Sequence, residues 1–223
     1  MSSQLKQRWE DFGTSHNADI EKVREVWLDL ERQHSIPGRD YHNLDHIGYS
    51  LTVLDDAYRN FRNRPPGLES QLRRVIAVLY CHDYFCDPRR KDNVIRSAAV
   101  AVRFSRRLFG PDVLALPIIM LTIATDHDLI LTDPVEQFIA DIDLASFAKR
   151  WEEYLADVWK LRRETSWMTD REFMLDRLKW LEKLSARKFI YYLPYFRDKY
   201  EWQAMSNIAR ELGLLRRITA RFK

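Results

Sequence analysis

Apolar residues recur at helical spacing along almost the whole chain. Near the N-terminus, for example, Val23, Trp27 and Leu30 stand three or four residues apart, which is the spacing of the buried face of a helix. Only six glycines occur in 223 residues, and the one β-like run, 189–193, is short. The sequence therefore predicts an all-α fold, and no apolar run reaches the length of about 20 residues that a membrane span needs.

Turn and capping residues divide this pattern into segments. We expect helices over approximately the following ranges: 4–34 with a break at 13–15, 47–58, 69–82, 93–108, 111–125, 134–144, 146–164, 170–184 and 200–212. Asp133 before Pro134, and Thr169 or Asp170, are typical of helix starts, and Gly213 is typical of a helix end. The chain is therefore predicted to be a succession of helices joined by short loops.

The length and the balanced charge bound the domain organisation and the partners. We expect one helical domain over 1–223, with a core at 36–150 and a helical C-terminal part at 151–223 packed on it. The 36 basic and 33 acidic residues leave a net charge of +3, which disfavours a nucleic-acid partner. Because the N-terminus has no apolar signal segment, we expect a soluble, cytoplasmic protein without a membrane partner.

The apolar run 75–80 ends abruptly in His82 and Asp83. Polar groups in a buried segment cost free energy unless they are hydrogen-bonded or bind a metal. The two side chains are therefore candidate metal ligands, and a capping or salt-bridged pair is the alternative. Cys81 and Cys86 flank them, and we favour ordinary reduced thiols over further ligands.

Further polar groups stand at the edges of other apolar segments. His42 and His46 are four residues apart, so on a helix they share one face and can bind one metal ion. Asp141 and Asp143 lie in an otherwise apolar helix, where a buried carboxylate is expected to pair or to bind a cation. A solvated edge is the alternative for these two acids. His127 ends another apolar helix, where it either belongs to a site or caps the helix.

The order of these groups resembles that of the HD-domain superfamily of metal-dependent phosphohydrolases. The resemblance is closer to one branch of it, small bacterial and phage proteins described as predicted hydrolases. It rests on four motifs, which are Tyr41-His42-Asn43-Leu44-Asp45-His46-Ile47, His82-Asp83-Tyr84-Phe85-Cys86-Asp87-Pro88, Ala124-Thr125-Asp126-His127 and Asp141-Ile142-Asp143-Leu144. The similarity covers nearly the whole chain and implies a single HD-type helical domain with its metal site in the 36–150 core.

The resemblance also implies a role for each matching residue. The four metal ligands that it implies are His46, His82, Asp83 and Asp143. His42 is implied as a substrate contact or a further ligand, and Asp141 as a carboxylate behind the ligands. Asp83 and His127 are the implied catalytic residues, His127 by donating to a phosphate or by binding a second metal ion. We expect one divalent ion or two, drawn from Mn, Fe, Co, Ni, Zn and Mg.

Positive side chains near these motifs point to the substrate. Arg39 precedes the first motif, and Arg89, Arg90 and Lys91 follow the second. Because guanidinium forks match phosphate oxygens, we predict that these residues bind a small phosphorylated molecule. A nucleotide fits best, and the activity would be that of a phosphatase or a dNTP triphosphohydrolase. A solvated basic loop is the alternative interpretation.

One motif departs from the branch. Its members carry an Asn-Glu-Glu-x-Ser-Ala pattern shortly after the His-Asp pair, whereas this chain has Asn93-Val94-Ile95-Arg96-Ser97-Ala98. If one of those glutamates is the general base, this chain lacks it, and Asp87 and Asp92 are the candidate substitutes. The alternative function is therefore that of a catalytically impaired HD-fold protein, which binds a nucleotide or a protein partner without turnover.

The C-terminal part of the chain is rich in tryptophan. Its residues of this type are Trp151, Trp159, Trp167, Trp180 and Trp202. They exceed what one small helical core needs, so we expect some of them to cover the metal cleft and others to form a homodimer face.

Overall fold

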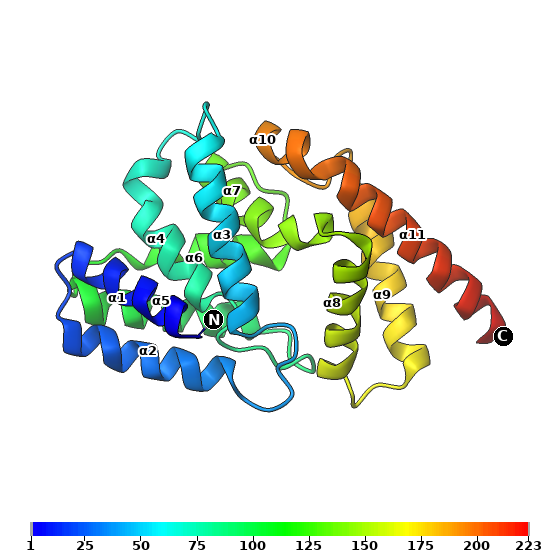
Figure 1. Cartoon of the computed structure of the whole chain (residues 1–223), viewed down its shortest axis with the longest axis horizontal. Helices are drawn as coiled ribbons and strands as arrows, with labels where there is room; N and C mark the ends of the chain where they lie inside the picture. The colour runs from blue at the N-terminus through cyan, green and yellow to red at the C-terminus, as the bar shows by residue number, and fades with distance from the viewer. Residues whose placement is uncertain (1, 223) are drawn as a thin grey trace. The chain divides into compact units, whose positions relative to one another are not determined.

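The computed structural model describes residues 2–222, and within that range every regular element is helical (Figure 1). The prediction of an all-α fold is thereby confirmed. The chain forms two compact units, Met1–Ala140 and Asp141–Lys223, each with its own packing. In the described range, no helix is both long enough and apolar enough to cross a membrane.

The first unit begins with a pair of helices and continues into a bundle. Its helices are α1 (Ser2–Ser15), α2 (Ile20–His34), α3 (Leu44–Asn60), α4 (Leu68–Cys81), α5 (Asn93–Phe109), α6 (Ala115–Ile123) and the short η1 (Ala124–Asp126). Helix α7 (Pro134–Leu144) starts in this unit and ends in the second. The expected division into two helices is confirmed, but not its position: residues 13–15 are still helical, because α1 ends at Ser15 and α2 begins at Ile20.

Side chains fix the starts of three of these helices. Asp19 accepts hydrogen bonds from two backbone N–H groups in the first turn of α2, at 2.9 and 3.3 Å. Asn43 accepts one from the first turn of α3 at 2.8 Å, and Asp133 accepts two from α7 at 2.7 and 3.0 Å. Each cap satisfies donors that the helix itself leaves without partners. The helix start predicted at Asp133 is confirmed.

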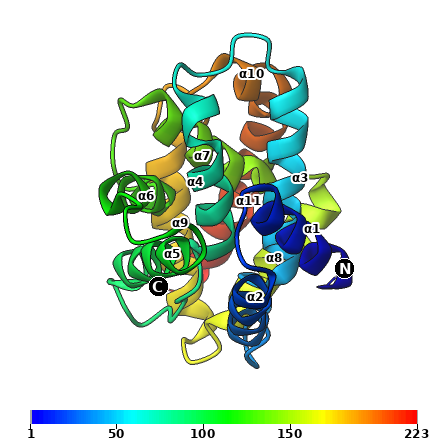
Figure 2. The same ribbon diagram turned by 90° about the vertical axis from the view of Figure 1, so that its left-hand side faces the viewer.

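Helix α4 lies at the centre of the first unit (Figure 2). It packs against α3, α5 and α6, while α1 and α2 lie side by side. Among the largest buried side chains are Trp9, Trp27 and Tyr80. The Trp9 indole donates a hydrogen bond to the carbonyl of Val23 at 2.9 Å, and its ring centre lies 4.7 Å from that of Tyr80. The apolar part of α4 is thus fixed in the core, and the chain leaves it directly at His82.

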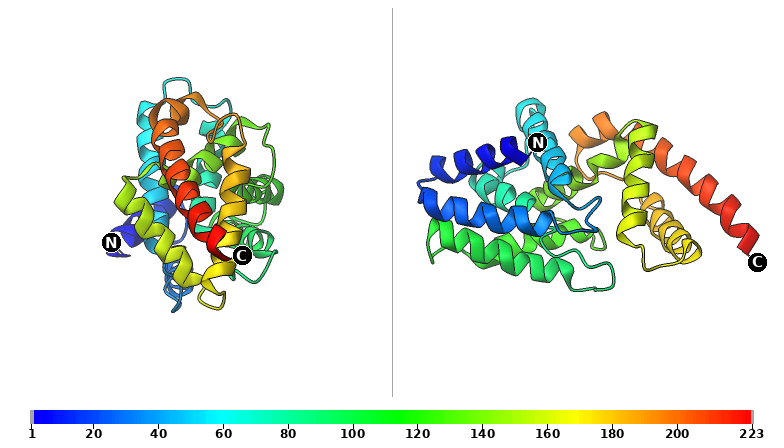
Figure 3. Two further views of the ribbon diagram at one scale, coloured as in Figure 1. Left: turned by 90° about the vertical axis from the view of Figure 1, so that its right-hand side faces the viewer. Right: turned by 60° about the horizontal axis from the view of Figure 1, so that its bottom comes forward.

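The second unit is built from helices joined by short turns. After the end of α7 its elements are η2 (Ala145–Ala148), α8 (Trp151–Glu164), α9 (Asp170–Ser185), α10 (Pro194–Phe196), the π-helical turn η3 (Arg197–Glu201), α11 (Trp202–Thr219) and η4 (Ala220–Phe222). Helices α9 and α11 run alongside each other (Figure 3). The start predicted at Thr169 is confirmed, since its hydroxyl and backbone N–H exchange hydrogen bonds with Glu172.

Two predicted helices in the second unit have different bounds in the structure. The helix expected at 146–164 is divided, because η2 ends at Ala148 and α8 begins only at Trp151. The last helix was expected at 200–212, but helical structure already starts at Pro194, whose fixed φ suits a first helical position. It continues to Thr219, so Gly213 lies inside α11 and does not end it.

A buried ionic cluster joins α8, α9 and α11. Arg177 donates to both carboxylate oxygens of Glu211 at 2.9 and 3.1 Å, and the Tyr154 hydroxyl donates to the same carboxylate. Only 10% of the Arg177 side chain and 4% of the Glu211 side chain are exposed. Removing one partner of such a pair would leave a buried charge without compensation. The cluster therefore fixes the three helices relative to one another.

Two glycines inside helices give opposite expectations for the same substitution. A methyl group on Gly13 would lie 2.4 Å from a methyl carbon of the buried Val23, whereas one on Gly213 would meet nothing within 4 Å. We expect Gly13→Ala to lower the free energy of unfolding by about 1–2 kcal/mol, because α1 and α2 must separate. Gly213→Ala should raise it by about 1 kcal/mol through helix propensity.

Urea denaturation of the two variants beside the wild type measures both effects. A Gly13→Ala protein as stable as the wild type would contradict the close packing of α1 on α2.

Candidate metal centre

His82 stands where α4 ends, and the helix determines which ring nitrogen it presents. Its backbone N–H donates to the carbonyl of Val78 at 2.7 Å, and its ring Nδ1 lies 3.1 Å from the carbonyl oxygen of Leu79. A carbonyl oxygen can only accept, so Nδ1 carries the proton and the neutral ring presents the lone pair of Nε2. The side chain is 1% exposed. This is the arrangement in which histidines commonly bind metal ions in proteins.

His46 and Asp83 converge on that lone pair. The Nε2 atom of His46, on α3, lies 3.1 Å from Nε2 of His82. The Oδ2 atom of Asp83 lies 3.0 Å from Nε2 of His82 and 3.4 Å from Nε2 of His46. Atoms bound to one ion at about 2.1 Å and separated by about 90–110° stand about 3.0–3.4 Å apart. The three separations therefore match those of ligands to a single small cation.

The charges in this cluster favour the ionised form of Asp83. Burial by itself would raise the pKa of this carboxyl. When the imidazoles are protonated, the charges of His82 and His42, a hydrogen bond from His82 and the charge of His46 together hold it well below its usual range. The side chain is 22% exposed, so it is reachable from solvent. Asp83 is thus a carboxylate at neutral pH, which is the form that binds a metal ion.

Arg39 ties the two halves of the cluster together. Its guanidinium donates to the carbonyls of His42 at 2.7 Å, Tyr84 at 3.0 Å and Gln33 at 3.3 Å, and also to the carbonyl of Asp83. The same side chain therefore holds the segment before α3 and the turn after α4. In the structure Arg39 positions these two backbone segments. The predicted contact of Arg39 with a phosphate stays a prediction.

His42 lies just before α3 and not on it. Asn43 caps that helix, which begins at Leu44, so the expectation that His42 and His46 share one helical face is wrong. The centres of their rings nevertheless lie 6.0 Å apart. The ring centre of Tyr41 lies 4.9 Å from that of His42 and 5.2 Å from that of His46. His42 is therefore close to the cluster through the turn, where it can reach a bound molecule.

The basic loop after the cluster is largely paired with its own acids. Arg89 donates to Asp87 at 3.2 Å, and Arg90 forms a two-pronged pair with Asp92 at 2.7 and 2.6 Å. Lys91 is exposed. Surface pairs of this kind contribute little free energy, so they can open for an incoming anion. The substrate role predicted for Arg89, Arg90 and Lys91 stays a prediction.

The two acids on α7 differ in their surroundings. Asp141 is buried and accepts hydrogen bonds at 2.8 Å from the backbone N–H groups of Tyr192 and Leu193. Burial raises the pKa of Asp141 to about 8, against the two backbone donors and Arg197, which favour the carboxylate. Asp141 therefore anchors the turn before α10. Asp143 lies in the last turn of α7, in the second unit, and its place among the ligands stays a prediction.

His127 and the departing motif complete the predicted residues. His127 follows η1 with a left-handed backbone, φ 59°, and is half-buried; its catalytic role stays a prediction. In the departing motif Ile95 is 56% exposed at the start of α5. Two residues of the same turn bond the loop after the cluster. The Asn93 side chain donates to the carbonyl of Asp87 at 2.7 Å, and the Ser97 hydroxyl accepts from the N–H of Phe85 at 3.0 Å. The motif thus anchors the loop without supplying an acid.

The sequence did not single out His34, which the structure places beside the cluster. It is 2% exposed, its Nδ1 lies 3.5 Å from the carbonyl oxygen of His42, and its Nε2 has no hydrogen-bond partner among residues 2–222. The one feature of the sequence that could have indicated it is its position in the last turn of an amphipathic helix. Cys81 and Cys86, in contrast, form no disulfide, and burial raises the pKa of the Cys81 thiol. That neither thiol is a metal ligand stays a prediction.

No protein-family model matches the chain, and neither a curated protein nor a solved structure is significantly similar to it. The residues of the cluster and their geometry are therefore the features that indicate a function.

Replacing Arg39 by lysine tests its positioning part. A lysine keeps the charge but cannot bond four carbonyls from two segments, so we expect Arg39→Lys to lower the free energy of unfolding by about 2–4 kcal/mol. The exposed Arg24, which pairs with Glu10 and Glu21 on the surface, provides the control. Arg24→Lys should change stability by less than about 0.5 kcal/mol. Equal effects of the two changes in urea denaturation would contradict the assignment.

His34 should make the fold sensitive to acid. Burial and the charge of Arg39 lower the pKa of His34 to about 3, partly opposed by Asp83 and the backbone of His42, while His82 adds to the lowering. The unfolded chain takes up a proton near pH 6.5, but the folded one does not. Stability is therefore complete above pH 6.5 and falls towards pH 3, by up to about 1.4 kcal/mol per pH unit from this group.

A His34→Phe variant removes this group and tests the expectation. The free energy of unfolding, measured from pH 7.5 to 4, should fall less steeply than in the wild type. Leu28→Ala, an exposed residue without a titratable group, is the control and should keep the wild-type slope. Parallel curves for His34→Phe and the wild type would count against a neutral, buried His34.

Proposed function

We propose that this protein is a metal-dependent phosphohydrolase of the HD-domain type. The observation that carries the proposal is the convergence of Nε2 of His46, Nε2 of His82 and Oδ2 of Asp83 within 3.0–3.4 Å of one another. Two lone-pair nitrogens do not approach so closely unless a proton or a metal ion lies between them. A carboxylate beside both nitrogens adds the negative charge that a divalent ion prefers.

The ligand types suit a divalent transition metal. Imidazole and carboxylate together bind Mn, Fe, Co, Ni or Zn, and Mg is a weaker fit because it prefers oxygen. Asp143 is the proposed fourth ligand, and His127 or His42 are proposed to bind a second ion or the substrate. A bound ion would supply a Lewis acid for a phosphoryl oxygen and a water molecule of lowered pKa.

The chain's own residues would orient the substrate around this centre. His42 and Tyr41 lie next to His46 and can contact a phosphoryl group there. The paired Arg89 and Arg90 are exposed and can exchange their carboxylates for phosphate oxygens. We therefore propose a small phosphorylated substrate, a nucleotide, cleaved by phosphatase or dNTP triphosphohydrolase chemistry. A cytoplasmic location and a homodimer, the latter through the exposed Trp159, belong to the same proposal.

A specific observation favours a second function. The exposed Ile95 stands where a glutamate of the resembled branch would, and the nearby acids Asp87 and Asp92 are paired with arginines. A centre without a general base would hold a metal ion and a nucleotide but turn it over slowly. The alternative is therefore a protein of the same fold that binds a nucleotide or a protein partner without hydrolysis.

Metal content measured by elemental analysis tests the proposal first. Wild-type protein, after incubation with Mn, Fe, Co, Ni or Zn and gel filtration, should retain close to one ion per chain. Asp83→Ala should lose most of it, because the cluster loses its only charged ligand in the first unit. Asp45→Ala is the matched control, since Asp45 is exposed on α3 directly before His46. It should retain metal as the wild type does.

A nucleotide panel with the retained ion then separates the two functions. Phosphate release lost in Asp83→Ala supports the hydrolase, whereas metal and nucleotide binding without release supports the alternative. A wild type that retains none of these ions would overturn both forms of the proposal.

A further inference from the structure

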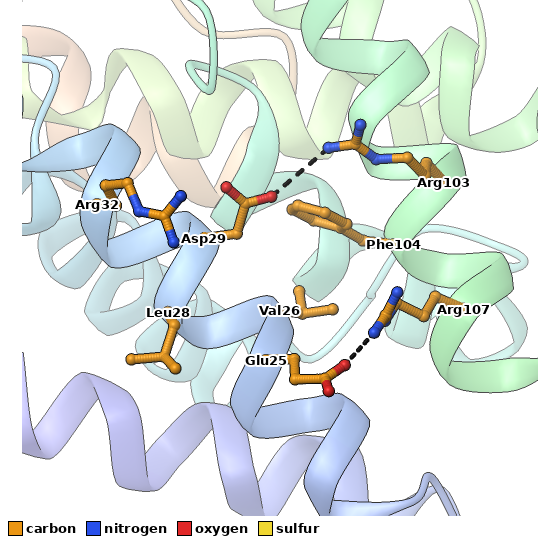
Figure 4. A pocket seen from close by; sticks show the side chains of 8 residues that line it. All are labelled: Glu25, Val26, Leu28, Asp29, Arg32, Arg103, Phe104 and Arg107. Carbon is orange, nitrogen blue, oxygen red and sulfur yellow. Dashed lines mark hydrogen bonds and ion pairs between the residues drawn. The ribbon is translucent and has the colours of Figure 1, made fainter.

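A pocket of about 620 Å³ opens between α2 and α5 in the first unit (Figure 4). Its walls are mainly charged, with three arginines and two acids, and the exposed Leu28 adds an apolar surface. None of the residues predicted for the metal centre lines it. The pocket therefore needs an explanation of its own, which lies in the pairing of its charges.

Two ion pairs connect the helices across the pocket. Arg107 donates to Glu25, and Arg103 lies 3.6 Å from Asp29, as the dashed lines in Figure 4 show. The two acids are four residues apart on α2, and the two arginines are four residues apart on α5. The residue numbers rise along one helix as they fall along the other. The pairs thus form successive rungs of a ladder between antiparallel helices, each one turn from the last.

The third rung of this ladder lacks its acid. Arg32 follows Asp29 by one turn on α2, and no described residue forms an ion pair with it. One turn before Arg103 on α5 stands the exposed Ala99, which offers no charge. The arginine that precedes Ala99 by one turn, Arg96, lies over the ring of Phe85 at 3.9 Å. A positive side chain therefore faces the pocket at a place where an anion would complete the pattern.

The neighbouring rung can share such an anion. Arg103 is 61% exposed and only loosely paired at 3.6 Å. One oxygen of Asp29 already accepts a hydrogen bond from the Tyr84 hydroxyl at 2.9 Å, so this acid does not depend on Arg103 alone. The three guanidinium groups and two carboxylates leave a net charge of +1 in the pocket. Arg32 and Arg103 can therefore turn N–H donors towards the same molecule.

We propose that this pocket binds a small organic phosphate. Its phosphate group lies between Arg32 and Arg103, and its apolar part packs on Leu28. Planar guanidinium groups match phosphate oxygens in pairs, and a phosphate monoester carries enough charge at neutral pH for two of them. The site is separate from the metal centre, so it extends beyond the hydrolase proposal and does not depend on it.

Calorimetric titration with phenyl phosphate tests the site in the whole protein. The wild type is first treated with EDTA, so that no metal ion can bind the phosphate. We expect one saturable event with a Kd of about 1 mM or tighter, and much weaker binding of uncharged phenol. The double variant Arg32→Gln/Arg103→Gln should bind at least about tenfold more weakly, because each arginine contributes charge-assisted hydrogen bonds.

The matched control is Arg24→Gln/Arg106→Gln, which removes one arginine from each of the same two helices outside the pocket. Arg24 pairs with Glu10 and Glu21, and Arg106 bonds the carbonyl of Val113. Its affinity should equal that of the wild type, and circular dichroism checks that all variants are folded. The Asp83→Ala variant should also bind normally.

Three results would overturn the proposal. They are the absence of saturable binding, the same affinity in Arg32→Gln/Arg103→Gln as in the wild type, and phenol binding as tightly as phenyl phosphate. Binding that is lost in Asp83→Ala but kept in the pocket variant would assign the phosphate to the metal centre. That result would overturn the second site while leaving the proposed hydrolase intact.

Discussion

The guanidinium of Arg39 is the interaction on which the candidate centre depends. It bonds carbonyls on both sides of the cluster, those of His42 and Gln33 and those of Asp83 and Tyr84. These carbonyls lie in turns or, for Gln33, in the last turn of α2, where no helical N–H is left to donate to them. Arg39 supplies the donors. Ligands from α3 and from the end of α4 can then meet within hydrogen-bond distance.

The cluster shows how local structure prepares a chemical site. Helix α4 ends at Cys81 because apolar residues give way to polar ones, and its last carbonyls hold the ring of His82 in one tautomer. The buried imidazoles keep Asp83 ionised despite partial burial. The free energy lost by burying these polar groups is offset by their mutual contacts and, on our proposal, by a metal ion.

Outside the candidate metal centre, some charged side chains pair completely in a buried cluster, and others pair incompletely at the surface. In the second unit Arg177, Glu211 and Tyr154 pair with one another in a buried cluster, in which both oxygens of Glu211 accept hydrogen bonds. Between α2 and α5 the pairs are exposed, and no acid in the described part of the chain pairs with Arg32. A cluster whose charged groups all have partners stabilises the packing of helices, whereas a charged group without a partner can bind a ligand. The presence of partners, more than the number of charges, distinguishes the two.

The sequence by itself determined the all-α fold, the break between α1 and α2, and the helix starts at Asp133 and Thr169, because helical periodicity and caps are local. It also marked His46, His82 and Asp83 by their place at apolar edges. Only the tertiary structure decided that Arg39 bonds backbone carbonyls, that Gly213 stays helical and that His34 is buried. These depend on which distant segments meet, and the spacing of residues along the chain does not specify that.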